Sequence, residues 1–266
     1  MPRSEIPVDV LRDILVYVDK AGLAVMCRVN KICCSCSQDV LYRDIQYDKS
    51  TFACSRTLAQ STHLARKVRS FDTRFYSDNL PMALRNMTSL RILKLSGAFH
   101  MDILDGCTFK LDSFECNHLE NCGESFPKFL NSQPSLKNVK LPLHFGSIAS
   151  SSLEVTCLPN LTRINARFSS LPYLIPGRPL NEVISSGSAW NEDSIDLSFF
   201  ALSTTPIQKL SIDYSYLYPT PMDLLASFLP SLTHFKLTVW DHHTFLKNEG
   251  VCGFPYINYW ILNNMP

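Results

Sequence analysis

The sequence predicts an α/β protein in which a small bundle of three helices precedes a curved parallel sheet. Two patterns carry this prediction: amphipathic helical stretches fill residues 5 to 45, and a short strand-like phrase recurs from residue 68 onward. The chain has 266 residues, of which 45% are hydrophobic and 18% charged. Such a composition supports a sizeable core and excludes a disordered chain.

The first predicted helix lies in "IPVDVLRDILVYV", residues 6 to 18. Pro7 suits its first turn, where a missing N–H costs nothing. One stripe of an amphipathic helix is formed by the apolar positions Val10, Leu11, Ile14, Leu15 and Val18.

Two further short helices are predicted before residue 45. Asp19 is a suitable N-cap for a helix through Leu23, Met26 and Cys27. The third helix has the apolar positions Val29, Ile32, Cys33, Cys36, Val40 and Leu41. A bundle of roughly 40 residues rarely buries enough surface to be stable alone. We therefore expect it to contact the rest of the chain or to keep an apolar surface for a partner.

The order of these residues resembles the F-box of the fungal type, the motif by which substrate receptors dock on the Skp adaptor of SCF (Skp–cullin–F-box) ubiquitin ligases. The chain departs from the family in using Ile6 for Leu and Tyr42 for Trp, both conservative in shape. The elements match in order: Ile6-Pro7, the pairs Val10-Leu11 and Ile14-Leu15, Leu23, Val29-Asn30-Lys31, and Leu41-Tyr42 within "LYRDI". The resemblance implies an F-box domain over residues 1–45. It also implies that adaptor binding involves Ile6, Pro7, Val10, Leu11, Ile14, Leu15, Leu23, Val29, Leu41 and Tyr42.

The recurring phrase consists of an apolar residue, two residues of any kind, an apolar residue, one of any kind and a third apolar residue. The eight copies follow each other at intervals of 19 to 27 residues. They read "VRSFDT" at 68, "LRILKL" at 90, "LDSFEC" at 111, "LKNVKL" at 136, "LTRINA" at 161, "LNEVIS" at 180, "IQKLSI" at 207 and "LTHFKL" at 232. Short amphipathic pieces precede several copies: "LPMALRNMTS", "FPKFLNSQPS" and "LLASFLPS". Helix, turn and strand within each interval predict a unit that must stack on its neighbours.

This period resembles that of leucine-rich repeats. The resemblance is loose, because the family's asparagine ladder is absent and two phrases end on Ala166 and Ser185. It implies a divergent leucine-rich repeat solenoid over residues 67–266, with residues 46–66 as a helical linker or N-terminal cap. The apolar C-terminal stretch "GFPYINYWILNNMP" either folds back as a cap or marks a solenoid that is incomplete at this end.

Residues beside the middle apolar position of each phrase are expected on the concave face, as a mixed polar strip with a basic centre. Solenoids use such faces to bind proteins or peptides, although polar residues also simply cover solvated strands. The target-binding candidates are Asp72, Arg74, Lys94, Glu115, Asn117, Asn138, Lys140, Arg163, Arg167, Lys209, Asp213, His234 and Lys236.

Motifs for catalysis or cofactor binding are missing from the sequence. There is no Gly-x-Gly, no H-E-x-x-H and no G-x-S-x-G. Cys33 and Cys36 have the spacing of a zinc knuckle or a redox pair, but a second such pair is lacking. Cys116, His118 and Cys122 lack a fourth ligand nearby. We therefore expect no metal, no cofactor and no enzymatic activity.

Net charge and hydropathy limit the partners and the compartment. The formal net charge is +1, which gives no reason to expect nucleic acid or a membrane as a partner. Lys and Arg outnumber acids by 15 to 9 over residues 1–94, which we interpret as a solvated basic face. The N-terminus lacks the apolar core of a signal peptide, so an intracellular protein of the cytoplasm or nucleus is expected.

The sequence thus predicts a substrate-recognition subunit of an SCF ubiquitin ligase, with the Skp adaptor, a cullin bound through it, and an unknown target as partners. Two alternatives stay open. One is a protein-interaction scaffold built on leucine-rich repeats without a role in ubiquitination, and the other is a zinc or redox protein centred on the cysteines.

Overall fold

The protein folds into helices and parallel strands, which confirms the predicted α/β class. The computed structural model describes residues 6–46, 51–120, 123–141, 153–154, 157–185, 196–213, 222–238 and 259–263. Two compact units are present, Met1–Leu111 and Asp112–Pro266. The division falls inside the region predicted as repeats, and the boundaries proposed after residues 45 and 66 stay predictions.

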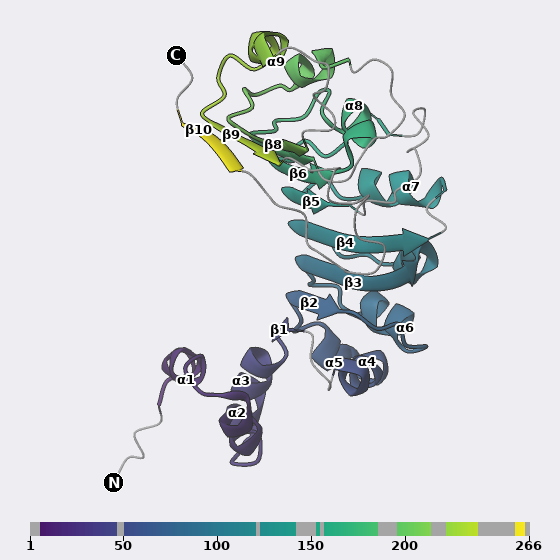
Figure 1. Cartoon of the computed structure of the whole chain (residues 1–266). Helices are drawn as coiled ribbons and strands as arrows, with labels where there is room; N and C mark the ends of the chain where they lie inside the picture. Colours follow the sequence, from purple (N-terminus) through teal and green to yellow (C-terminus); the bar gives the residue numbers. More distant parts are fainter. Residues whose placement is uncertain are drawn as a thin grey trace, which may run out of the picture. The chain divides into compact units, whose positions relative to one another are not determined.

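Three short helices begin the first unit (Figure 1): α1 (Val8–Leu15), α2 (Lys20–Met26) and α3 (Lys31–Leu41). Pro7 lies just before α1, and its carbonyl accepts the amide of Leu11. Asp19 caps α2 as predicted, since its carboxylate accepts the amide of Gly22 at 2.8 Å. Asn30 caps α3 in the same way, through the amide of Cys33 at 2.8 Å.

Few side chains form the core of these three helices. Leu15, Leu23 and Cys36 are buried, and five half-buried apolar side chains pack against them: Leu11, Val18, Met26, Val40 and Leu41. This core is small for an independent domain.

The rest of the first unit contains the first three strands, β1 (Asp44–Ile45), β2 (Ser70–Thr73) and β3 (Ile92–His100), which pair in parallel. Figure 1 shows α4, α5 and α6 grouped beside β2. Their bounds are α4 (Thr51–Gln60), α5 (Thr62–Ala65) and α6 (Leu80–Asn86), and a 3₁₀ helix, η1 (Met101–Leu104), follows β3.

The second unit repeats the same construction. Six strands pair in parallel and in sequence order: β4 (Ser113–Glu120), β5 (Asn138–Lys140), β6 (Arg163–Ala166), β7 (Glu182–Ser185), β8 (Lys209–Asp213) and β9 (His234–Thr238). A final strand, β10 (Tyr259–Asn263), pairs with β9 in the antiparallel direction. The intervening helices are α7 (Ser125–Asn131), η2 (Phe168–Ser170), α8 (Leu171–Leu174), η3 (Ser198–Leu202) and α9 (Met222–Phe228). Helices α7, α8 and α9 lie on one side of the strands (Figure 1).

Every copy of the recurring phrase contains one parallel strand, and the middle apolar residues lie in register. Phe71 pairs with Leu93 in the first unit. In the second unit each middle residue is the register partner of the one in the next strand, in the order Phe114, Val139, Ile164, Val183, Leu210 and Phe235. All six of these side chains are buried. The periodicity therefore predicts both the strands and the apolar positions of the core.

The backbone joins successive strands in a constant way. The carbonyl of the second residue of a phrase accepts two consecutive amides of the next phrase, at 2.8–3.1 Å. Arg69, for example, accepts the amides of Arg91 and Ile92, and Thr162 accepts those of Asn181 and Glu182. Because only the backbone takes part, the side chain at this second position is unconstrained by the contact.

Arg178 is the largest fully buried side chain described, with 1% of its surface exposed. Its guanidinium donates to the carbonyls of Cys157, Tyr173, Pro176 and Glu154 at 3.1–3.2 Å. A buried charge requires such saturation by hydrogen bonds. We infer that Arg178 has a structural role, since it joins two loops of the second unit.

Candidate functional site

A group of exposed apolar side chains covers the three N-terminal helices. Of the fifteen large apolar side chains exposed among the described residues, nine lie between residues 6 and 32. They are Ile6, Val8, Val10, Ile14, Val16, Tyr17, Val25, Val29 and Ile32, and we call this set the N-terminal apolar surface. Such a concentration of exposed apolar side chains marks a site of protein or membrane interaction. Within the described ranges, no helix has the length and apolar content to span a membrane.

The structure divides the predicted adaptor-binding residues into two groups. The first group is exposed and consists of Ile6, Pro7, Val10, Ile14 and Val29. The residue Ile6 is 60% exposed. Their side chains are available to a partner without any rearrangement.

The other predicted residues are turned toward the bundle. Leu15 and Leu23 are buried, at 1% and 3% exposure, and Leu11, Leu41 and Tyr42 are half-buried. Leu15 and Leu23 therefore hold the three helices together. The sequence pattern places exposed Val10 and Ile14 on the same stripe of α1 as inward-facing Leu11 and Leu15, and it cannot separate them. It missed five exposed apolar positions: Val8, Val16, Tyr17, Val25 and Ile32.

The segment "LYRDI", residues 41 to 45, connects the three helices to the first strand. Ile45 is buried and lies in parallel register with Phe71. Tyr42 is half-buried, and burial raises the pKa of its phenol, with smaller contributions from Cys54 and Cys27. This segment belongs to the parallel strands as well as to the end of α3, a second role that the sequence did not reveal.

The clustered cysteines of α3 differ in burial. Cys33 and Cys36 are buried and Cys34 is half-buried, as their helical spacing predicts. Cys27 lies near Cys34, and burial is the main cause that raises the pKa of the Cys27 thiol. Over the described part of the chain, no three His, Cys, Asp or Glu side chains are grouped as metal ligands. Of Cys116, His118 and Cys122, the last lies outside the described residues.

Eleven of the thirteen predicted target-binding residues lie in the strands, where they alternate with buried residues on one polar face, whereas Arg74 and Arg167 follow the ends of β2 and β6. Neighbouring strands place candidates directly opposite each other: Asp72 with Lys94, Glu115 with Lys140, Asn138 with Arg163, and Lys209 with His234. Asp72, Glu115, Lys140 and Arg167 are half-buried, whereas Arg74, Lys94, Asn117, Asn138, Arg163, Lys209, His234 and Lys236 are exposed. The side chain of Asp213 lies outside the described residues.

Ion pairs neutralise much of the charge on this polar face. Lys140 Nζ lies 2.5 Å from Glu115 Oε1, and Arg163 Nη2 lies 3.3 Å from Glu182 Oε1. Glu182 is absent from the predicted set although it occupies the position equivalent to Arg163 in the next strand. Because Lys140 and Arg163 each face an acid, the predicted basic centre is a row of paired charges. Such a row favours specific, oriented contacts over general attraction.

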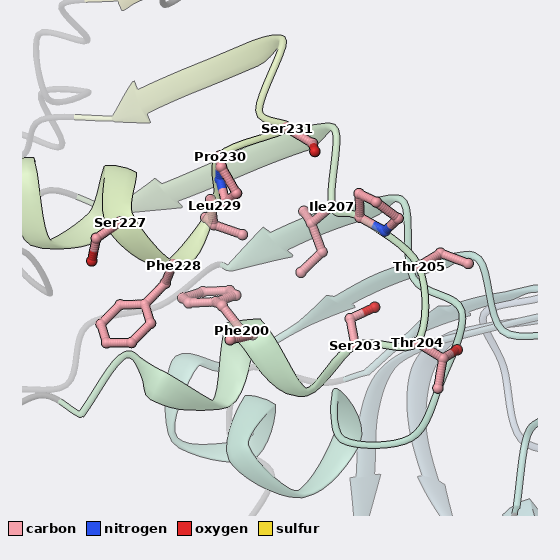
Figure 2. A pocket seen from close by; sticks show the side chains of 12 residues that line it. Phe200, Ser203, Thr204, Thr205, Ile207, Ser227, Phe228, Leu229, Pro230 and Ser231 are labelled. Atoms are coloured by element: carbon pink, nitrogen blue, oxygen red, sulfur yellow. The ribbon is translucent and has the colours of Figure 1, made fainter.

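One open pocket of about 420 Å³ lies in the second unit, between the turns that precede β8 and β9. Figure 2 shows Phe200 and Phe228 at one end and the hydroxyls of Ser203, Thr204 and Thr205 at the other. Ser203 and Thr205 donate to backbone carbonyls, among them that of Leu180. No titratable side chain lines the pocket. The hydroxyls of the pocket therefore have no general base among the lining residues.

Family models and curated protein sequences were both compared with the chain. No family model matches the chain. No curated protein sequence matches it significantly.

Proposed function

We propose that the chain is the substrate-recognition subunit of an SCF ubiquitin ligase, in which residues 1–45 are an F-box that docks on the Skp adaptor. The observation that carries the proposal is the N-terminal apolar surface. Ile6, Val10, Ile14 and Val29 are exposed at positions that match the F-box pattern. Burial of these side chains by a partner supplies the free energy that the small core of the three helices lacks.

In this proposal the remaining strands and helices form a divergent leucine-rich repeat solenoid that binds the target protein. The in-register parallel strands and the helices between them support it. The two ion pairs of the polar face, Glu115–Lys140 and Arg163–Glu182, suit a protein or peptide surface of complementary charge.

The chain itself performs no bond-making step in this function. It holds the target close to an E2 enzyme that the cullin recruits, so that the effective concentration of the target lysines rises. The proposal therefore predicts function without a cofactor or a metal, and with partners in the cytoplasm or nucleus.

Co-expression with a Skp adaptor tests the proposal. We expect the full chain to capture the adaptor, and the double variant Ile6→Ala with Pro7→Ala to capture less of it while unfolding at the same temperature as the wild-type chain. A wild-type chain that binds no adaptor would leave the alternative of a scaffold outside the ubiquitin pathway.

A further inference from the structure

Three arginines lie in a row just before the first three parallel strands. The residue immediately before each strand is an arginine: Arg43 before β1, Arg69 before β2 and Arg91 before β3. The carbonyl of Arg43 accepts the amide of Arg69, and the carbonyl of Arg69 accepts the amide of Arg91, each at 2.8 Å. The three residues are thus neighbours across consecutive strands, which are about 4.8 Å apart. We call them the arginine row.

The backbone contact at this position does not require arginine. The equivalent residues of the second unit accept amides in the same way, and they are Asp112, Lys137, Thr162, Asn181 and Gln208. Acidic, basic, hydroxyl and amide side chains are therefore all compatible with this backbone contact. The backbone contact therefore does not by itself account for arginine at all three positions of the first unit.

All three side chains are exposed, and two of them make the same kind of contact. Arg69 Nη1 donates to the carbonyl of Ser89 at 3.2 Å, and Arg91 Nη1 donates to the carbonyl of Lys110 at 3.4 Å. Each acceptor is the residue just before the next phrase, so both side chains extend toward the following strand. The remaining nitrogens of each guanidinium are left to other acceptors.

Carboxylates are scarce around the row. Arg69 and Arg91 have no ion pair within the described part of the chain, and Arg43 Nε lies 4.0 Å from Asp44, with both side chains more than 60% exposed. Over residues 43–111, which include all three arginines, there are eleven Lys and Arg side chains and six acidic ones. Like charges on adjacent strands repel each other, and an anion that contacts all three arginines would relieve this repulsion.

We propose that the arginine row binds an acidic segment of a partner protein. Alternate side chains of an extended peptide point the same way about 6.6 Å apart, which the long arginine side chains can follow. Carboxylate and phosphorylated side chains are both acceptors for the planar guanidinium fork. The row lies outside the N-terminal apolar surface, so the inference does not depend on adaptor docking.

Fluorescence anisotropy of the full chain with a short labelled peptide of alternating Ser and Asp tests the inference. We expect this peptide to bind, the same peptide with Asn for Asp to show no binding, and affinity to fall between about 50 mM and 200 mM salt. The variant Arg69→Gln with Arg91→Gln should weaken binding at least about tenfold. Arg69→Lys with Arg91→Lys, which keeps the charge and loses the fork, should give an intermediate loss.

The matched control is Arg56→Gln with Lys128→Gln, which removes two exposed positive charges elsewhere and should change affinity less than about twofold. A phosphoserine peptide that binds more tightly, and loses affinity in the Arg69 and Arg91 variant, supports the same site with phosphate as the better anion. Absence of binding by the wild-type chain overturns the proposal, as does an equal loss in both double variants. Tighter binding of a single-stranded oligonucleotide at the row overturns the assignment to a peptide. Adaptor capture by the Arg69 and Arg91 variant should equal that of the wild-type chain.

Discussion

Asp39 on α3 forms an ion pair with Lys67, which lies just before β2. Asp39 Oδ2 also lies 3.3 Å from Nη2 of Arg12 on α1. One carboxylate therefore joins two of the N-terminal helices to the segment that leads into the parallel strands. The Lys67 side chain is only 14% exposed and the Asp39 side chain 31%. The N-terminal helices are thus connected to the first strands by charge as well as by the "LYRDI" segment.

The Asp39→Asn variant should lower the free energy of unfolding by about 1 kcal/mol, because the largely buried Lys67 loses its anion. Urea denaturation of the full chain measures this change. The control is Glu124→Gln, which removes one partner of an exposed pair with Lys128 and should have no measurable effect. Equal effects of both substitutions would contradict a special role for Asp39.

Gly97 in β3 lies against the backbone that follows β2. A Cβ atom at this position would be 1.9 Å from the carbonyl oxygen of Arg74, and a backbone atom cannot move aside cheaply. Gly97→Ala should therefore destabilise the chain by about 2 to 3 kcal/mol, seen as a lower thermal unfolding temperature. Ala98→Ser, which alters the next, exposed residue, should unfold with the wild-type chain. An unchanged Gly97→Ala variant would show that the two strands are farther apart.

Cys36 and Cys34 differ in burial, and their substitution should differ accordingly. Cys36→Ser places an unpaired hydroxyl in the core beside Leu15 and Leu23 and should cost about 1 to 3 kcal/mol of unfolding free energy. Cys34→Ser, at a half-buried position, should change stability by less than about 0.5 kcal/mol. Stoichiometric zinc in the wild-type chain that is lost in Cys33→Ser with Cys36→Ser would instead support a metal site.

Burial raises the pKa of the Cys107 thiol from 9.0 to about 12, and the nearby Arg85 offsets only part of this effect. In the unfolded chain the thiol loses its proton above about pH 9, whereas in the folded chain it keeps it. Folding stability should therefore fall as the pH rises from about 9 toward 12, by up to about 1.4 kcal/mol for each pH unit. Urea denaturation at pH 8 and 10 measures this loss. It should be smaller in Cys107→Ala, and an identical loss in both proteins would assign it to other groups.

Local patterns predicted the elements because they report on burial along one chain segment. The phrase beginning at Leu180 predicts β7 although it ends on Ser185, since Leu180 and Val183 suffice to fill the core. The cap at Asp19 follows from side-chain chemistry alone.

These local patterns could not predict features that depend on contacts between segments far apart in the sequence. Val10 and Leu15 share one apolar stripe of α1, yet only the packing of α2 and α3 determines that Leu15 is buried and Val10 exposed. The pairing of Glu182 with Arg163 depends on strand register, to which the period of the repeats is only an approximate guide. The arginine row requires the same register, because its members are separated by more than twenty residues in the sequence.

The affinity of the full chain for a purified Skp adaptor, measured by isothermal titration calorimetry, tests the proposed docking surface most directly. Ile14 on α1 is 51% exposed, and Leu202, in the second unit, is exposed to a similar 56%. The account predicts that the wild-type chain binds the adaptor, that Ile14→Ala weakens binding by about tenfold, and that Leu202→Ala binds as the wild-type chain does. A wild-type chain without affinity for the adaptor, or equal losses in the two variants, would contradict it.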